Sequence, residues 1–238
     1  MADRFSFPWR GEHDVEGNML EGGNNSNPVV AVAGVRSSEP THRWRDCLPT
    51  LDGDRVTLRE LRAADAPWLV AMITPPEVSR FISPPPSTVP AFERFIARSR
   101  AQQSAGVLAC FAVTLRGHDS PIGLFQLRAL TPDFAVAEWG FAISSDFWGT
   151  GLFAECAALV LEFAFSKVGV HRLEARAAVL NGRGNRALQK LGAVQEGVLR
   201  QAFLFDGDYV DQMLYSLVED EWRASRDVGP RVHSVVIH

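Results

Sequence analysis

Apolar and polar residues alternate along several short stretches of the chain, which is the pattern of half-buried strands. Alternation starts at 55–61, where Val56 and Leu58 fall on one side of the predicted strand. A hairpin is predicted over 201–217, because Asp206-Gly207 favours a tight turn between two strands. The other predicted strands are 108–115, 122–130, 135–144 and 172–179.

Other stretches repeat apolar residues every three or four positions and therefore predict helices, at 63–73, 89–103 and 151–167. The last of these carries the clearest apolar stripe and begins directly after a Gly-x-Gly turn. The stripe includes Cys156, which is expected to pack in the core. Glu155 and Glu162 share one side of this helix and are expected to be solvated or structural.

The first fifty residues differ from the rest of the chain. Residues 1–50 are rich in Gly, Asn, Ser and Pro and show no sustained period, so they predict a flexible N-terminal arm. The apolar run 29–33 is an exception that either adds a strap across the domain or a neighbouring subunit, or only touches the surface. One domain is expected over 51–224, followed by a C-terminal tail over 225–238.

Composition limits the function classes. The 238 residues are 46% hydrophobic and 22% charged, which is ordinary for a globular domain with one sizeable core. The net charge of −4 argues against a general nucleic-acid binder, which would carry a basic excess. The three cysteines are odd in number and widely spaced, so neither a disulfide framework nor a metal site is expected.

Localisation follows from similar arguments. No N-terminal stretch has a basic start followed by an uninterrupted apolar run, so no signal peptide is expected. The most apolar run, 152–165, contains two glutamates and is too short to span a bilayer. We therefore expect a cytoplasmic protein that does not bind membranes.

The turn before the third predicted helix is the first candidate for chemistry. It reads Trp148-Gly149-Thr150-Gly151-Leu152 and connects a strand to a helix start. The unpaired N–H groups and the dipole of a helix start together favour an anion such as a pyrophosphate. A tight connection that binds no ligand has the same residue pattern, so these residues alone leave both interpretations open.

Three further motifs follow this turn in order: His171-Arg172-Leu173-Glu174-Ala175-Arg176-Ala177, the run from Asn181 to Ala193, and Glu196-Gly197-Val198-Leu199-Arg200. Together with Trp-Gly-x-Gly, the series resembles the GNAT superfamily of acyl-CoA-dependent N-acyltransferases, and most of all its RimJ/RimL-type subgroup. The resemblance covers about 54–222. It implies an α/β (α+β) fold with a mostly antiparallel central sheet of six to seven strands, a splayed parallel pair in its middle, and helices on both faces.

The resemblance also implies acetyl-CoA as co-substrate and a set of residues that hold it. The pyrophosphate would lie on Trp148, Gly149, Thr150, Gly151 and Leu152. The pantetheine arm would run between strands 138–143 and 172–179, beside Ile143. Asn181 matches the family asparagine that contacts this arm. Arg183 and Arg186 either meet the adenosine phosphates or are surface arginines.

The chain departs from the family at three places. Asp146 and Thr150 stand where the phosphate turn usually carries Gln or Arg and often a second basic residue. Gly184 stands where many relatives have a hydroxyl residue, and Leu188 where others have a tyrosine. Phe203 stands where some members of the subgroup have an acidic residue on the strand after the last helix. Phosphate binding would therefore depend on backbone amides, and no familiar acid and base pair is intact.

Two carboxylates are candidates for proton transfer. Strand alternation places Glu138 on the same side as Gly140 and Ala142, where a partly buried carboxylate can take a proton from an attacking amine. The alternative is a structural carboxylate paired with an arginine or a backbone amide. Asp208 lies in a turn that resembles the subgroup's last turn, near the acceptor, and it is equally a good turn residue.

The expected mechanism is direct attack in a ternary complex, with the thioester carbonyl polarised by a backbone N–H near Ile143. The acceptor stays open between a protein N-terminus, a polyamine and an aminoglycoside-like amine. Two other classes also stay open: a non-catalytic acyl-CoA-binding or regulatory module, and a self-associating or partner-binding protein, for example a homodimer. The proline loop 83–87 either gates the substrate or is a rigid connector.

Overall fold

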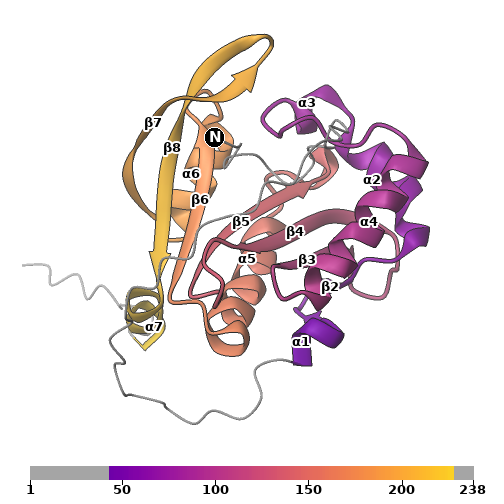
Figure 1. Cartoon of the computed structure of the whole chain (residues 1–238), viewed down its shortest axis with the longest axis horizontal. Coiled ribbons are helices and arrows are strands. Elements are labelled where there is room, and N and C mark those ends of the chain that lie inside the picture. The colour runs from indigo at the N-terminus through magenta and orange to yellow at the C-terminus, as the bar shows by residue number, and fades with distance from the viewer. Residues whose placement is uncertain (1–42, 228–238) are drawn as a thin grey trace, which may run out of the picture.

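The computed structural model describes residues 43–227, so most of the predicted arm, including 29–33, and the last residues of the tail lie outside the described residues. Eight strands form one sheet in the order β1-β2-β3-β4-β5-β6-β8-β7 (Figure 1). The strands are β1 (Leu51–Asp52), β2 (Val56–Glu60), β3 (Leu108–Leu115), β4 (Pro121–Ala129), β5 (Val136–Ile143), β6 (Arg172–Ala178), β7 (Val194–Phe205) and β8 (Asp208–Val218).

All neighbouring strands are antiparallel except β5 and β6, which are parallel. The expected mixed α/β fold with a central parallel pair is therefore confirmed. The expected number of six to seven strands was too low, since the sheet has eight. The additional strand is β1, whose two residues are too short to show a hydrophobic period.

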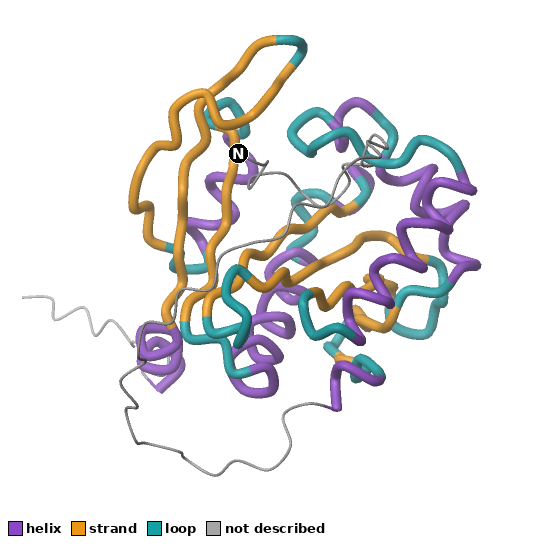
Figure 2. The backbone as a smooth tube through the Cα atoms, in the orientation of Figure 1, coloured by secondary structure: helices purple, strands orange, loops and turns teal. Residues whose placement is uncertain are grey.

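Helices cover both faces of this sheet (Figures 1 and 2). α2 and α4 pack on one face and α5 packs on the other. The helical segments are α1 (Arg43–Asp46), η1 (Ala63–Asp65), α2 (Ala66–Ile73), α3 (Pro76–Ser79), α4 (Val89–Ser104), η2 (Ser145–Phe147), α5 (Leu152–Phe163), η3 (Ala164–Val168), α6 (Gly182–Lys190) and α7 (Glu219–Asp227).

The period of two along the strands divides the core into two layers. In the middle of β3, β4 and β5, odd-numbered residues such as Phe111 and Trp139 pack against α5, while even-numbered residues such as Leu124 and Ala142 pack against α2 and α4. Cys156 of α5 lies fully inside the first layer, as expected, and burial raises the pKa of its thiol to about 12. Within the described residues no helix is long and apolar enough to cross a membrane.

The packed part of the chain begins before residue 51. Trp44 of α1 is 5% exposed, and its ring meets that of Phe134 edge-on at 5.4 Å between centroids. Leu48 is buried in the same layer. At the other end, Trp222 of α7 packs on Phe165. The division of the chain into arm, domain and tail stays a prediction, and two residues of the predicted arm, Trp44 and Leu48, are buried in the core layer.

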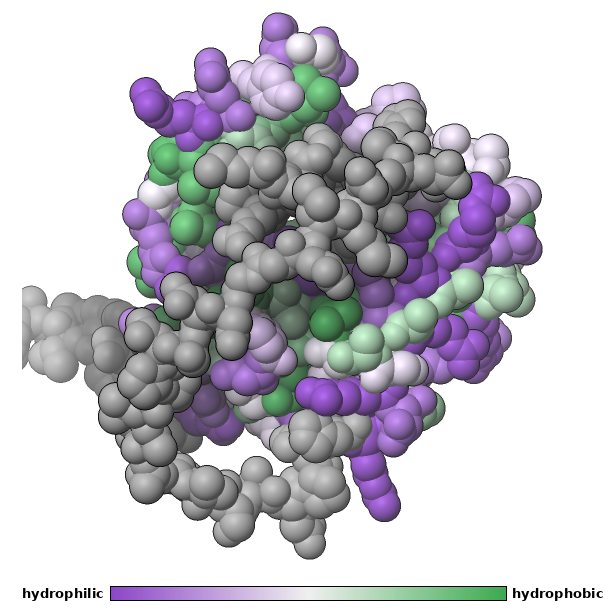
Figure 3. All heavy atoms as spheres, viewed as in Figure 1, coloured by the Kyte–Doolittle hydropathy of each residue, from purple (hydrophilic) through white to green (hydrophobic). Residues whose placement is uncertain are grey.

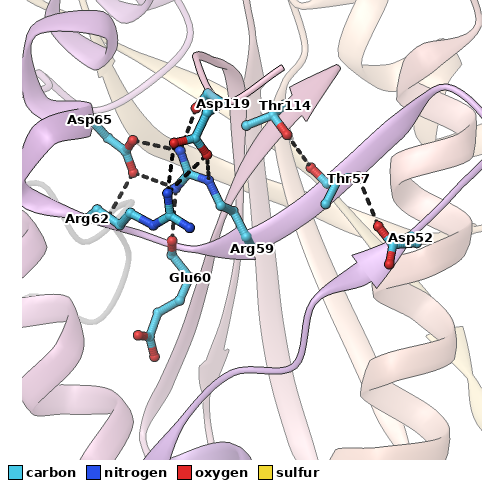
Figure 4. Close-up of polar contacts among 8 residues, drawn as sticks. All are labelled: Asp52, Thr57, Arg59, Glu60, Arg62, Asp65, Thr114 and Asp119. Carbon is cyan, nitrogen blue, oxygen red and sulfur yellow. Dashed lines mark hydrogen bonds and ion pairs between the residues drawn. The ribbon is translucent and has the colours of Figure 1, made fainter. Parts of the chain in front are cut away.

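A buried arginine joins β2 to the first helices (Figure 4). Two guanidinium nitrogens of Arg59 donate to the two carboxylate oxygens of Asp65 at 2.9 and 2.8 Å, and Nε donates to Asp119 at 2.9 Å. The hydrogen bonds to Asp65 raise the pKa of Arg59 above its ordinary value. This cluster fixes η1 and the β3–β4 loop to the strand between them.

Exposed apolar side chains gather on the long β7–β8 hairpin (Figure 3). Val198 is 48% exposed, Leu204 47% and Tyr209 63%. The predicted tight turn at the tip of this hairpin is confirmed, because Asp206 and Gly207 have the left-handed φ values of 47° and 91° that such a turn requires.

Candidate active site

The parallel pair at the centre of the sheet separates soon after it forms. Residues 136–138 of β5 pair with 172–174 of β6, and beyond that point the two described strands are no longer paired. β5 nevertheless continues to Ile143 and β6 to Ala178. In Figures 1 and 2, β6 and β8 lean away from β5 above their point of contact. A gap that widens toward the carboxyl ends of both strands results.

Backbone donors of β5 face this gap. Ser144 N donates to Ile122 O at 2.9 Å, and Leu130 N donates to Val136 O at 2.8 Å. Because every second residue of an antiparallel strand bonds the same neighbour, the even-numbered residues of β5 bond β4. The N–H groups of the odd-numbered residues therefore point toward β6, and those of Phe141 and Ile143 lie beyond the last pair between the two strands. They form a row that an extended ligand can join as a strand would.

The turn at the end of β5 is tightly folded. Gly149 and Gly151 have φ values of 77° and 84°, which residues with a Cβ rarely adopt. The indole Nε1 of Trp148 donates to Ile143 O at 2.9 Å, and Thr150 Oγ1 donates to Phe147 O at 2.7 Å. Gly151 caps α5 without a side-chain hydrogen bond of its own, and the first helix amide, Leu152 N, makes only a long hydrogen bond of 3.5 Å to Thr150 Oγ1. A helix start of this kind favours an anion.

The start of α6 lies across the gap from this turn. The guanidinium carbon of Arg183 is 3.4 Å from the centroid of the Trp148 ring, which is a close cation–π contact. Arg186 lies beside Gly182, since a Cβ there would be 3.6 Å from its Nη1. The structure thus places Arg183 against the turn, whereas Arg186 is shown only beside Gly182 at the start of α6.

Asn181 caps α6. Its Oδ1 accepts a hydrogen bond from Gly184 N at 2.9 Å. A Cβ at Gly184 would lie 2.6 Å from Asn181 Nδ2, so a larger residue there would displace the amide. The glycine that departs from the family pattern therefore leaves room for Asn181 to fold over the helix start.

Glu138 lies where the two strands separate. Its side chain is 16% exposed, and it contacts Arg128 of β4 and Arg176 of β6, the latter at 2.7 Å. The structure matches the structural alternative of a carboxylate paired with arginine. An ionised carboxylate has about four acceptor positions, which is more than these two contacts occupy. The catalytic role of Glu138 stays a prediction.

Glu138 is the start of a row of charges across the sheet. Arg176 also contacts Glu174 at 3.4 Å, and Arg172 links Glu174 at 3.0 Å to Glu196 of β7. Hydrogen bonds from Arg172 and from Ser216 lower the pKa of Glu196 to about 2. Arg128 and the rest of this row were not predicted from the sequence. Strand alternation places them on one face, but their contacts depend on a strand register that the sequence does not supply.

Asp208 lies far from Glu138. The register aligns Glu138 with Glu174 and Glu174 with Ser216, and Asp208 is at the opposite end of the same β8 strand. At about 3.3 Å per residue, Ser216 and Asp208 are roughly 26 Å apart along β8. Ile143 is roughly 17 Å from Glu138 along β5 by the same measure. The structure therefore does not bring the two candidate carboxylates to one reacting atom.

A second contact joins the two sides of the gap. Phe81, just before the proline loop, stacks on Phe205 of the β7–β8 hairpin with 5.5 Å between ring centroids, and Arg80 lies 5.3 Å from the Phe205 ring. The gating role of the loop stays a prediction. Among residues 43–227 no group of three or more His, Cys, Asp or Glu side chains is placed to hold a metal ion.

Comparison with known proteins gives consistent results. The family model described as acetyltransferase (GNAT) domain matches residues 55–194. The uncharacterized N-acetyltransferase YoaA of Bacillus subtilis (strain 168) is 29% identical over 176 residues, which are 72% of this chain and 97% of YoaA. The [ribosomal protein uS5]-alanine N-acetyltransferase of Escherichia coli (strain K12) is 28% identical over 93 residues, 39% of this chain and 48% of that protein.

A solved structure of Mycobacterium smegmatis RimJ in complex with CoA-disulfide superposes with a TM-score of 0.64 at 22% identity. It covers 70% of this chain and 83% of the RimJ chain. At that identity the likeness supports the fold alone.

Proposed function

Because the chain belongs to the GNAT family of acetyltransferases, we propose that it moves an acetyl group from acetyl-CoA to a primary amine by direct attack in a ternary complex. Relatives that acetylate ribosomal proteins agree with the RimJ/RimL-type resemblance. The observation that carries the proposal is the gap between β5 and β6, which has a row of backbone donors along one wall and an uncapped helix start at its open end.

The donor would lie along β5. Its pyrophosphate binds the amides of Gly149, Thr150, Gly151 and Leu152, and its pantetheine arm bonds the N–H groups that face β6. Trp148 supports this turn through its bond to Ile143 O, which leaves Ile143 N–H for the arm. On the far wall, Asn181 and Arg186 meet the arm and the adenosine phosphates. Acetyl-CoA here is a co-substrate, and no metal takes part in the proposal.

Strand geometry suggests where the thioester lies. An arm whose phosphate is at the turn runs back along β5 toward the point where the strands meet. The thioester carbonyl then lies nearer Phe141 than Ile143, on the side of the gap where Glu138 lies. The amine attacks the carbonyl carbon, a β5 N–H stabilises the oxyanion, and the C–S bond breaks to release the CoA thiolate. Glu138, directly or through water, takes the amine proton.

Alignment is the larger contribution to rate. Holding the amine and the thioester together contributes about 7 to 11 kcal/mol, whereas one proton-transfer group contributes roughly 3 to 5 kcal/mol. The enzyme therefore works even where the usual acid and base are incomplete. Asp208, distant from Glu138, is better suited to attract a cationic acceptor than to take its proton.

A non-catalytic acyl-CoA-binding module is the second candidate. It is favoured by the two guanidinium contacts of Glu138 and by Gly184, which cannot act as an acid. In that case acetyl-CoA binds but no amine is acetylated.

One experiment separates these functions. Acetyl-CoA is titrated into the wild type by calorimetry, and thiol release is then followed with an alanine-starting peptide, spermidine and an aminoglycoside. Binding with turnover supports the enzyme, and the amine with the highest kcat/KM identifies the acceptor class. Binding without turnover supports the module, and the absence of binding contradicts both.

A truncation tests the arm. Deletion of residues 1–42 is expected to leave turnover nearly unchanged, because the deletion ends before the buried Trp44. Loss of activity with the fold intact would instead assign a function to the arm.

A further inference from the structure

Arg55 lies just before β2, outside the turn that binds the donor, yet it contacts that turn directly. Its Nη1 donates to Thr150 O at 3.0 Å. Its Nε and its backbone N donate to the two carboxylate oxygens of Glu155, at 2.9 and 2.7 Å. Glu155 is in the first turn of α5. One residue thus holds both the turn and the helix start that follows it.

We propose that Arg55 is a positioning residue for the pyrophosphate of the donor, acting through the peptide between Thr150 and Gly151. In a planar trans peptide the C=O and the following N–H point in opposite directions. Because Arg55 holds Thr150 O on the β2 side, the Gly151 N–H is directed to the other side, where the phosphate binds. This inference rests on the proposed function.

The turn needs such a restraint. Gly149 and Gly151 flank Thr150, and glycine rotates with little steric cost, so this peptide can turn over unless something holds it. Thr150 Oγ1 donates to Phe147 O at 2.7 Å and accepts a long hydrogen bond from Leu152 N at 3.5 Å, and neither bond holds the Thr150 carbonyl. The turn itself contains Asp146 and Thr150 but no basic residue. Arg55, which lies just before β2, therefore restrains the turn from outside.

Geometry matters more here than charge. The Arg55 side chain is 52% exposed, and Glu155 offsets its charge, so its long-range field is weak. Burial acts to raise the pKa of Glu155, but the hydrogen bonds from Arg55 outweigh it and the pKa lies below its ordinary value. The contact between Arg55 and Glu155 is consequently formed throughout the neutral pH range.

The β1–β2 turn closes over this contact. A Cβ at Gly53 would lie 2.5 Å from Glu155 Oε1, so glycine allows the carboxylate to approach closely. Arg116, the residue after the end of β3, donates from its Nη1 to Gly53 O at 3.1 Å and so also holds the β1–β2 turn. We call Arg55, Glu155 and the Thr150 carbonyl the Arg55 clasp.

The test compares two donors in Arg55→Gln: acetyl-CoA, and S-acetylpantetheine, which has no pyrophosphate. The KM for acetyl-CoA and the Kd for CoA are expected to rise about tenfold, in keeping with the loss of one or two well-placed hydrogen bonds. The KM for S-acetylpantetheine and both kcat values should stay within about twofold, because the β5 N–H groups proposed to bind the pantetheine arm are unchanged. Arg55→Lys restores part of the affinity, since one amine reaches only one of the two acceptors.

The matched control is Arg62→Gln, which removes an exposed arginine that pairs with Asp119 rather than with the turn. This control is expected to leave the KM for both donors unchanged. An Arg55→Gln variant that weakens both donors equally, or neither, overturns the inference. If this variant does not fold, Arg55→Lys gives the same comparison. A wild type that binds neither acetyl-CoA nor inorganic pyrophosphate overturns the proposed function together with the inference.

Discussion

Arg55 and Arg59 lie four residues apart at β2 and hold different parts of the molecule. Arg59 is 8% exposed, and its partners are the carboxylates of Asp65 and Asp119. Arg55 is 52% exposed, and it binds a backbone carbonyl in a glycine turn and the carboxylate of Glu155. The difference shows that burial and partner, not residue type, determine whether an arginine stabilises the fold or shapes a binding site.

The energies of the two clusters should differ accordingly. Removing one partner of a buried ion pair leaves an uncompensated charge and costs about 3 to 5 kcal/mol. An exposed pair contributes about 0 to 1 kcal/mol. Substitution of Arg59 is therefore expected to lower the free energy of unfolding. Substitution of Arg55 is expected to weaken donor binding instead.

The largest effect is expected for Arg59→Met. It leaves Asp65, which is 3% exposed, without its guanidinium partner, and the free energy of unfolding in urea should fall by about 3 to 5 kcal/mol. The folded fraction should bind acetyl-CoA with wild-type Kd. Arg62→Gln is the control and should cost less than about 1 kcal/mol. An equal loss in both variants would contradict the distinction between buried and exposed pairs.

A smaller effect is expected for Gly151→Ala, with Gly169→Ala as its control. Both glycines have a φ of 84°, so each alanine costs about 1 to 2 kcal/mol of stability by urea unfolding. Gly151→Ala should in addition raise the Kd for acetyl-CoA, because the strained residue carries a phosphate-binding amide. If Gly169→Ala weakens acetyl-CoA binding as much, the effect is not local to the turn.

A third prediction concerns pH. The pKa of Glu196 is lowered to about 2 by Arg172 and Ser216, from an ordinary value of about 4.3. Its contribution to stability is therefore complete above the ordinary value and is lost as pH falls through about 2. The difference in urea midpoint between wild type and Glu196→Gln should be constant from pH 6 to 8 and should shrink in acid, at roughly pH 4 and below. A difference that grows in acid would contradict this sign.

The smallest effect is expected for Gly53→Ala. The new Cβ would press on Glu155 Oε1, but a carboxylate at the end of a flexible side chain can move aside. The KM for acetyl-CoA should rise by less than about threefold, with S-acetylpantetheine unchanged, which corresponds to well under 1 kcal/mol. A rise equal to that of Arg55→Gln would mean that the position of Glu155, rather than Arg55 itself, controls the turn.

Much of the fold could be predicted from the sequence because it depends on local periods. The strand that became β5, the helix α5 and the glycine turn between them each follow from neighbouring residues. The Arg55 clasp could not be predicted, since Arg55 and Glu155 are 100 residues apart in the chain. Trp44 was also missed, because a four-residue helix within a Gly-, Asn- and Ser-rich segment shows no period.

The site was only partly predictable for the same reason. Glu138 was recognised together with the alternative of an arginine partner, but the partners Arg128 and Arg176 are on strands whose register emerges only from the whole sheet. The distance between Glu138 and Asp208 depends on that register as well. Sequence motifs suggested both residues as candidates for proton transfer. Only the alignment of β5, β6 and β8 shows that the two residues lie far apart.

The separation of β5 and β6 has a consequence for self-association. Most sheets expose their unpaired backbone at the outer margins, where another polypeptide can extend them and lead to aggregation. Within residues 43–227, the amides of β5 that no neighbouring strand pairs are in the interior of the sheet, between strands that remain joined at Glu138 and Glu174. Such an interior margin admits a slender molecule that enters lengthwise, whereas a foreign strand with side chains on both faces would have to push the two halves apart. The separation of β5 and β6 thus leaves the sheet incomplete in its middle and at the same time protects it from pairing with another polypeptide.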